Sequence, residues 1–381
     1  MTQADFALGP NTPQLIQLLQ WIGQPIPLME QCAQRYGDTF AIRLLRGRAS
    51  VFGSHPQFIQ AIFTAEPEVF DAGASNGLLL PLLGDASLIL LDGDRHRRQR
   101  QLLMPPFHGE RMRAYERIIT TTTERIAAQW RTGSTFNLRQ ALQDISLQVI
   151  LAAVFGITDE QRFQSLRQLL PSLLDLTGSP LSSSLLFLPA LQRDWGAWSP
   201  WGRFVRLRDR LDRLVFAEIA ERRAHPDPER TDILALMLAA RDEDNQPMTD
   251  LELRDELMTL LVAGHETTAS AIAWAMYWLH REPATLKTLV DELDANVGAE
   301  DAKPFSRLPY LGAVCNEALR IYPVAPITFP RILKVPMTIA GREYQPGNSV
   351  VPCIYLTHRR PELYPDPATF RPERFLERQF S

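Results

Sequence analysis

Residues Ala263–Thr268, with the sequence AGHETT, combine residue types that a core helix seldom carries together: a glycine, an acid and two hydroxyls. A threonine hydroxyl can bond the carbonyl four residues back and open a helix locally. Glycine lets a flat group approach the backbone. A solvent-facing polar turn is the simpler interpretation. A zinc site of the H-E-x-x-H type is excluded, because Ala269 occupies the place of the second histidine.

These residues lie in the middle of a stretch that we expect to form one long helix, Thr249–Arg281. Thr249 followed by Glu252 predicts a capping box at its start, leucines then recur at helical spacing, and Pro283 marks its far end. The apolar character is broad rather than confined to one stripe. The pattern therefore predicts a helix buried in the middle of the protein.

The densest basic run of the chain is Asp94–Arg100, with the sequence DRHRRQR. As a helix it places His96 and Arg100 on one face, four residues apart. Two interpretations stay open. The run is either a solvated helix face or a clamp for an anionic group, since guanidinium binds carboxylates in a bidentate manner.

A second charged pair, Glu317 and Arg320, lies three residues apart on a predicted short helix, Pro309–Ile321. Such pairs are usually exposed and contribute roughly 0–1 kcal/mol. The apolar neighbours of this pair favour burial instead. A buried pair needs further partners to offset its desolvation.

Helical periodicity dominates residues 110–225, whereas strand-like patterns are confined to Phe40–Leu44, to Ser50–Phe52 after a predicted hairpin turn, and to the region after Val335. This pattern predicts a mainly α fold with small β-sheets. Leu78–Leu91 is apolar and contains glycine, and we expect it to cover an apolar site. No linker divides the chain, so residues 1–381 are interpreted as a single domain.

The composition limits the possible partners and compartments. The chain has 381 residues, 45% of them hydrophobic, and a net charge of −4; it is long enough for a large core, and its charge does not favour nucleic acid. Its three cysteines show no metal-type spacing, which favours a reducing compartment. The first residues contain no apolar run suited to a leader or a membrane anchor. We therefore expect a cytoplasmic protein.

Taken together and in order, these motifs resemble those of the cytochrome P450 haem monooxygenases. Ala263–Thr268 resembles the family's [A/G]-G-x-[D/E]-T-[T/S] motif, and Glu317–Arg320 resembles its E-x-x-R motif. Phe370–Phe375 is similar to its P-E-R-F segment, Leu356–Pro367 to the preceding meander, and His96–Arg100 to its H-x-x-x-R pattern. The resemblance extends from about Tyr36 to the last residue. It implies a P450-like fold.

The resemblance also implies haem b, placed between the central helix and a later cysteine loop, and hydroxylation with O2. Glu266 and Thr267 would be the catalytic residues, orienting a water molecule and delivering protons to bound dioxygen. Ala263 and Gly264 would let haem and O2 come close to the helix.

Two further groups of residues receive roles from the resemblance. The haem propionates would be held by His96, Arg100 and Arg331. A buried structural triad would be formed by Glu317, Arg320 and Arg374.

The aliphatic character of the expected pocket suggests a fatty acid, an alkane or a terpenoid as the substrate. The residues expected to line the pocket are Leu78, Leu90, Val262, Val324 and Ile327. Electrons would come from a ferredoxin or flavodoxin partner, because the chain contains no flavin or NAD motif.

The family's proximal iron ligand is a cysteine thiolate within F-x-x-G-x-x-x-C, shortly after P-E-R-F. The sequence ends at Ser381 without it, and neither Cys32, Cys315 nor Cys353 has that context. We therefore expect a P450 fold truncated before the cysteine loop and the helix that follows. Two alternatives stay open: an inactive fragment, or a haem-free binder of apolar ligands. An all-α scaffold unrelated to haem would require the ordered motifs to be coincidental.

Overall fold

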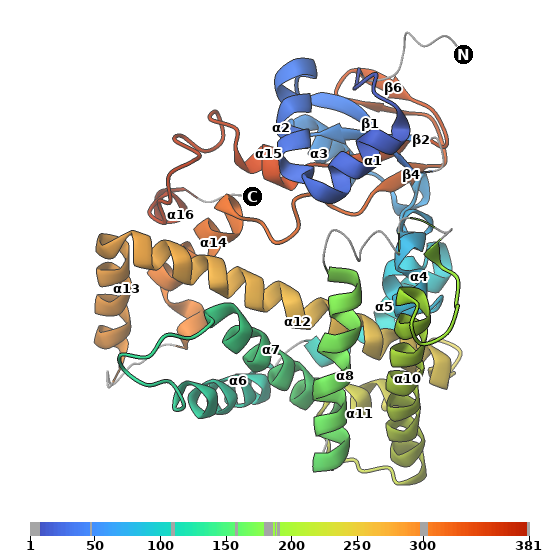
Figure 1. The fold of residues 1–381 in the computed structure, drawn as a ribbon, viewed down its shortest axis with the longest axis vertical. Coiled ribbons are helices and arrows are strands. Elements are labelled where there is room, and N and C mark those ends of the chain that lie inside the picture. The colour runs from blue at the N-terminus through green and yellow to red at the C-terminus, as the bar shows by residue number, and fades with distance from the viewer. Residues whose placement is uncertain are drawn as a thin grey trace.

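Helices make up most of the structure, and two small sheets lie together at one end (Figure 1). The structure is a computed structural model that describes residues 8–45, 48–107, 111–156, 159–178, 186, 188, 191–297 and 304–378. The long helix α12 (Asp250–Arg281) crosses the middle of the molecule. The strand-bearing part lies above it in Figure 1, and most of the other long helices lie below it. The predicted fold class, mainly α with small β-sheets, is confirmed.

The larger sheet brings distant parts of the chain together. Its strand order is β1-β2-β7-β4-β3, and β2 pairs in parallel with β7 from Ser50↔Ser349 to Gly53↔Pro352. The two remaining strands, β5 and β6, form a separate antiparallel pair. The strands are β1 (Thr39–Leu45), β2 (Arg48–Gly53), β3 (Phe70–Asp71), β4 (Arg331–Leu333), β5 (Met337–Ile339), β6 (Arg342–Tyr344) and β7 (Ser349–Pro352).

The remaining helices surround α12 and the larger sheet. Those before α12 are α1 (Gln14–Gly23), α2 (Pro25–Tyr36), α3 (Pro56–Phe63), α4 (Leu80–Leu83), α5 (Gly93–Leu103), α6 (Arg111–Ala127), α7 (Leu138–Phe155), α8 (Glu160–Gly178), α10 (Pro200–Ala224) and α11 (Ile233–Ala239). Those after it are α13 (Pro283–Asn296), α14 (Pro309–Ile321), α15 (Ile354–His358) and α16 (Arg374–Glu377). Short 3-10 turns include η3 (Ala74–Leu79) and η4 (Leu88–Leu90).

Helix α12 starts with the predicted capping box. The Thr249 hydroxyl accepts a hydrogen bond from Glu252 N at 3.2 Å, and the Glu252 carboxylate accepts one from Thr249 N at 2.7 Å. The predicted burial holds for the N-terminal half, where Leu253–Thr259 is buried without a break. Beyond this half, buried and exposed positions alternate, because α7 covers one side of the helix and leaves the other open.

Gly264 lies where α12 and α7 approach each other closely. A Cβ atom at this position would come within 2.8 Å of Cδ1 of Ile150 on α7. The Gly264 carbonyl also accepts a hydrogen bond from the Ser146 hydroxyl at 2.8 Å. The direction that a Cβ would take points to α7, so helix packing by itself accounts for glycine here. The approach of haem and O2 to the helix at Ala263 and Gly264 stays a prediction.

The substitution Gly264→Ala should lower the free energy of unfolding by about 1 kcal/mol, because overpacking against Ile150 outweighs the helix propensity of alanine. Gly312→Ala on α14 is the matched control. Nothing lies within 4 Å of its Cβ position, so it should raise the free energy of unfolding by up to about 1 kcal/mol. Urea unfolding measures both changes. Equal stabilisation by the two substitutions would contradict the packing role of Gly264.

Candidate functional site

The middle of α12 presents an open face. Ala263 and Thr267 are exposed one helical turn apart, whereas His265 and Ala269 are buried on the other side of the helix. The Thr267 hydroxyl donates a hydrogen bond to the carbonyl of Ala263. A hydroxyl with this local bond can exchange it for a ligand or a water molecule. The structure therefore places two of the predicted site residues together on one accessible face.

Glu266 points to α7 rather than along the face that carries Thr267. Its carboxylate accepts hydrogen bonds from Gln143 Nε2 at 2.6 Å and from Arg139 at 3.0 Å. Among the described residues, no hydrogen bond joins Glu266 to Thr267. The acid and the hydroxyl are neighbours in sequence, but they face different surroundings because consecutive helical residues are rotated by about 100°.

His265 is buried beside Glu266, with its Nε2 atom 3.6 Å from the carboxylate. Its Nδ1 atom has no hydrogen-bond partner in the described part of the chain. Burial lowers the pKa of His265 below its ordinary value. The imidazole is therefore neutral at pH 7 and adds no charge to the helix interior.

The basic run on α5 divides into side chains with different functions. Arg98 binds Asp242 at 2.6 Å and Glu252 at 2.7 Å, so it ties α5 to the start of α12. Arg97 forms an exposed ion pair with Asp94. Arg98 therefore has a structural role. The sequence suggested only a solvated helix face or an anion clamp for this run and did not predict that role.

His96 and Arg100 share one face of α5, and neither side chain has a hydrogen-bond or ion-pair partner among the described residues. Burial lowers the pKa of His96, and the charge of Arg100 lowers it further. A carboxylate placed between them would reverse this effect by favouring the charged imidazole. This pair therefore suits an anionic group.

Arg331, the third predicted propionate ligand, lies on β4. It donates a hydrogen bond to the carbonyl of Ile62 at 2.9 Å, and its guanidinium stacks 4.7 Å from the Phe63 ring centroid. Burial lowers its pKa. Among the described residues Arg331 makes no direct contact with His96 or Arg100, so the shared role of these three residues at the haem propionates stays a prediction.

The structure does bring Glu317, Arg320 and Arg374 together. Arg320 binds both carboxylate oxygens of Glu317, at 2.7 and 2.8 Å, and Arg374 Nε binds one of them at 3.1 Å. All three side chains are at most 3% exposed. The pair on the E-x-x-R helix is therefore buried, and Arg374 supplies the third member from a different segment.

This triad also orders the irregular chain between α15 and α16. Arg320 donates hydrogen bonds to the carbonyls of His358 and Pro367, and Arg374 donates to that of Pro365. Backbone N–H of Arg371 donates to Glu317 at 2.8 Å. These bonds satisfy buried charges that would otherwise be costly to desolvate.

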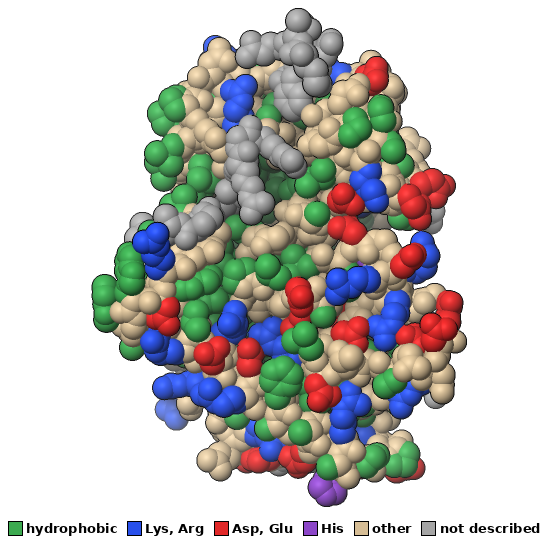
Figure 2. Space-filling model, turned by 90° about the vertical axis from the view of Figure 1, so that its right-hand side faces the viewer, with side chains coloured by type: hydrophobic (Ala, Val, Ile, Leu, Met, Phe, Trp, Pro, Cys, Tyr) green, Lys and Arg blue, Asp and Glu red, His purple; other side chains and the backbone are tan. Residues whose placement is uncertain are grey.

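The expected pocket residues fall into two groups. Leu90 and Val262 are half-buried and pack against the same hydrophobic cluster around α12, and Leu78 is half-buried in η3. Ile327 packs against the cluster beneath α2, and Val324 is 36% exposed. Figure 2 shows hydrophobic side chains gathered between the upper part of the molecule and the more charged lower part.

The three cysteines do not offer a thiolate. Cys32 and Cys353 are buried, and burial raises their pKa to about 11 and about 12. Cys315 is exposed on α14, and its pKa is also raised by desolvation. The described residues contain no group of His, Cys, Asp and Glu side chains arranged for a metal ion. Each cysteine is therefore a protonated thiol at neutral pH, and none lies in the F-x-x-G-x-x-x-C context of the family's iron ligand.

One set of polar residues was not foreseen from the sequence. Asp255, Glu256 and Thr259 are buried on α12, and each forms a hydrogen bond with the loop before η4. Burial raises the pKa of Glu256 to about 7. Two adjacent acids inside an apolar helical stretch were the signal that could have identified them.

Within the described ranges, no helix combines the length and the apolar character needed to cross a bilayer.

Removal of the Glu317 carboxylate by Glu317→Gln should lower the free energy of unfolding by about 3–5 kcal/mol, because two buried guanidinium groups lose their counter-charge. Asp291→Asn breaks the exposed pair with Lys287, at 2.6 Å, and serves as the control; it should cost less than about 0.5 kcal/mol. Urea unfolding compares the two. A loss below about 1 kcal/mol for Glu317→Gln would contradict a structural triad.

Glu256 should make stability depend on pH. Its pKa is raised from 4.5 to about 7 in the folded chain, so the folded state binds the proton more tightly than the unfolded state does. The contribution is full below about pH 4.5 and is lost as the pH rises to about 7, by about 3 kcal/mol. Glu256→Gln should remove this slope. Parallel pH profiles for the two proteins would contradict the assignment.

Comparisons with known proteins extend over nearly the whole chain. The family model "Cytochrome P450" matches residues 8–380. Cytochrome P450 135B1 of Mycobacterium tuberculosis is 38% identical over 369 residues, which cover 97% of this chain and 76% of that protein. Cytochrome P450 138 of the same species is 36% identical over 366 residues, covering 96% and 79%. Neither name states a substrate.

A solved structure shows the same fold. The retinoic acid-bound cyanobacterial CYP120A1 matches with a TM-score of 0.82 and 26% sequence identity, covering 97% of this chain and 82% of that one. The family match, the relatives and the fold agree with the arrangement of the motifs around α12 and α14. The chain belongs to the cytochrome P450 family, whose members are haem-dependent monooxygenases that use O2 and redox partner proteins.

Proposed function

We propose that this protein hydroxylates an apolar small molecule, such as a fatty acid, an alkane or a terpenoid. The observation that carries the proposal is the open face of α12, where Thr267 is accessible on a helix whose preceding turns, Leu253–Thr259, are buried without a break. The side chains expected around this face are aliphatic and offer no polar anchor. Retinoic acid, which the cyanobacterial neighbour binds, is an apolar carboxylic acid and fits the same class.

Haem b would be held at its propionates by His96 and Arg100, since both cationic side chains lack partners among the described residues. Arg331 would contribute a third positive charge from β4. The proximal side is different. None of the three cysteines fits as the thiolate ligand, so the residues present do not complete the haem site, and we derive no reaction step through the iron.

When bound, haem supplies the activation of dioxygen. The residues of this chain would control protons and water on the open face of α12. Thr267 would exchange its bond to the Ala263 carbonyl for a water molecule, and Glu266 would deliver protons from the solvent side. This delivery requires Glu266 to leave Arg139 and Gln143, which bind it on α7.

Electrons would come from a ferredoxin or flavodoxin, because the sequence carries no nucleotide-binding motif of its own. We place the protein in the cytoplasm, since its three cysteines are all free.

An alternative is a haem-free binder of apolar ligands. The observation that favours it is the position of the cysteines, since Cys32 and Cys353 are buried in one hydrophobic cluster and none of the three has the sequence context of the family's iron ligand. The two functions predict different absorption spectra for the purified protein, since only hydroxylation requires bound haem.

The spectrum of the reduced, carbon monoxide-bound protein, purified from cells supplied with a haem precursor, tests the proposal. Haem incorporation with retention on gel filtration supports a haem protein. A red-shifted Soret band of the thiolate type would show that one of Cys32, Cys315 and Cys353 binds iron, contrary to our assignment. Absence of any haem signal would favour the haem-free alternative.

In a haem-loaded chain to which the family's cysteine loop has been added, supplied with ferredoxin and its reductase, Thr267→Ala should raise the hydrogen peroxide formed per NAD(P)H severalfold at the expense of product. Thr268→Ala is the matched control, because Thr268 is the exposed threonine next to it. Coupling that stays the same in Thr267→Ala, or falls equally in both variants, would exclude the proton-delivery role of Thr267.

A further inference from the structure

The loop before η4 is bound to the N-terminal half of α12 by three successive contacts. Ala86 N donates to Asp255 at 2.9 Å, and Leu88 N donates to Glu256 at 2.7 Å. Between them, the hydroxyls of Ser87 and Thr259 lie 2.7 Å apart. Three consecutive residues, the last of them the first residue of η4, are therefore bonded by three side chains that lie within about one turn of the helix.

These contacts are buried. Asp255 and Ser87 have no exposed surface, and Glu256 is 1% exposed. A buried carboxylate or hydroxyl is costly unless it is hydrogen-bonded. An apolar helix surface would bury the loop without this cost, but it would not fix the position of the loop. The directed hydrogen bonds of the polar groups do fix it.

Gly84 shows how closely the loop fits. Its φ is +90°, and a Cβ atom there would lie 2.1–2.2 Å from the carboxylate of Asp255. Both the backbone angle and the space therefore require glycine. A bulkier residue would displace the loop from α12.

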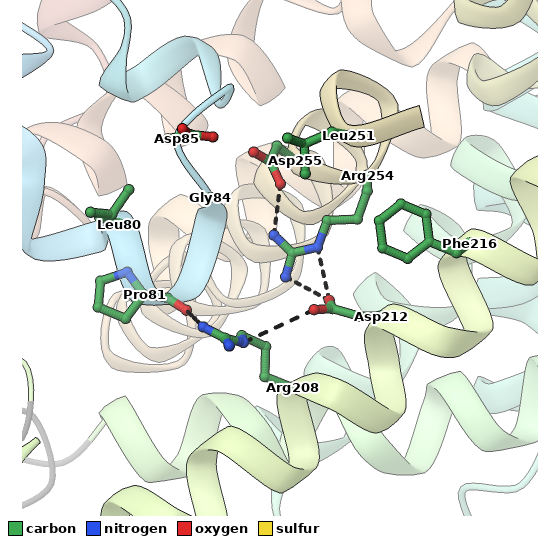
Figure 3. A pocket seen from close by; sticks show the side chains of 10 residues that line it. All are labelled: Leu80, Pro81, Gly84, Asp85, Arg208, Asp212, Phe216, Leu251, Arg254 and Asp255. Carbon is green, nitrogen blue, oxygen red and sulfur yellow. Dashed lines mark hydrogen bonds and ion pairs between the residues drawn. The ribbon is translucent and has the colours of Figure 1, made fainter. Parts of the chain in front are cut away.

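Two arginines complete the attachment (Figure 3). Arg254 binds Asp212 on α10, Asp255 and the carbonyl of Leu83, and Arg208 donates to the carbonyl of Pro81 at 3.0 Å. The pocket drawn in Figure 3 thus joins α10, α12 and the loop, with Arg208 and Arg254 paired to Asp212 and Asp255.

The far end of the loop is held as well. Asn76 donates to the carbonyl of Ile89 at 2.9 Å, and Asp92 accepts from Gly73 N and Ala74 N at 2.8 and 2.9 Å. The turn η4 is therefore bonded on both sides. Its three apolar side chains are half-buried and pack on the cluster that also includes Val262.

We propose that Asp255, Glu256 and Thr259 are positioning residues that hold Leu88–Leu90 as a fixed wall beside Val262, and so set the length of the apolar molecule that the open face of α12 accepts. The ordering of the loop stands on the contacts alone. The effect on ligand length rests on the proposed function.

Amide hydrogen exchange of the full chain tests the ordering. In Thr259→Val and Glu256→Ala, peptides covering 84–91 should exchange about tenfold faster than in the wild type, because a buried hydrogen bond to the loop is lost. Peptides covering 39–53 should be unchanged. Exchange in 84–91 that stays at the wild-type rate in both variants would overturn the proposal.

Two further variants separate positioning from general destabilisation. Thr64→Val removes an exposed hydroxyl that bonds the carbonyl four residues back, as Thr259 also does, but contacts no loop near η4. It should leave exchange in 84–91 unchanged. Glu256→Gln keeps an acceptor for Leu88 N and should restore slow exchange if Glu256→Ala folds poorly. Fast exchange in Glu256→Gln equal to that in Glu256→Ala would count against a directed hydrogen bond.

Ligand length is tested with decanoate and palmitate, whose dissociation constants are measured by equilibrium dialysis. In Thr259→Val the ratio of the two constants should change at least about threefold, with Thr64→Val at the wild-type ratio, since only the former frees the wall. An unchanged ratio with fast loop exchange would overturn the length-setting role. No binding of either acid by the wild type would contradict the proposed function and with it that role, while the exchange result would still decide whether the loop is held.

Discussion

The buried polar groups of α12 are the constraint on which the neighbouring structure depends. A carboxylate or hydroxyl inside a core must find a hydrogen-bond partner. Asp255, Glu256 and Thr259 find theirs in a loop that precedes them by about 170 residues. The polar groups of the helix can therefore be buried only if the loop supplies their hydrogen-bond partners, and the loop is ordered only if these groups bind it.

The same principle orders the C-terminal part of the described chain. Residues between α15 and α16 form few regular hydrogen bonds, so their backbone carbonyls need other donors. Arg320 and Arg374 supply them while both form ion pairs with Glu317. An irregular segment thus becomes as fixed as a helix, because its conformation is set by the geometry of two guanidinium groups.

Between these two ordered regions, α12 changes from a core helix into a boundary. Residues Leu253–Thr259 are enclosed, whereas Ala263 and Thr267 face outwards and Glu266 turns to α7. The change follows from the partners of the helix: α7 packs closely at Gly264 on one side and nothing comparable covers the other among the described residues. A rigid helix with one accessible face is suited to present a hydroxyl without exposing its core.

The sequence by itself determined the features that depend on local spacing. The capping box at Thr249, the pairing of Glu317 with Arg320 three residues on, and the family resemblance all follow from short patterns. Only the tertiary structure decided that Gly264 serves helix packing, that Glu266 binds Arg139 and Gln143, and that Asp255 and Glu256 hold a distant loop. Each of these depends on which segments meet across the fold, and the periodicity of a helix gives the face of a side chain but not its partner.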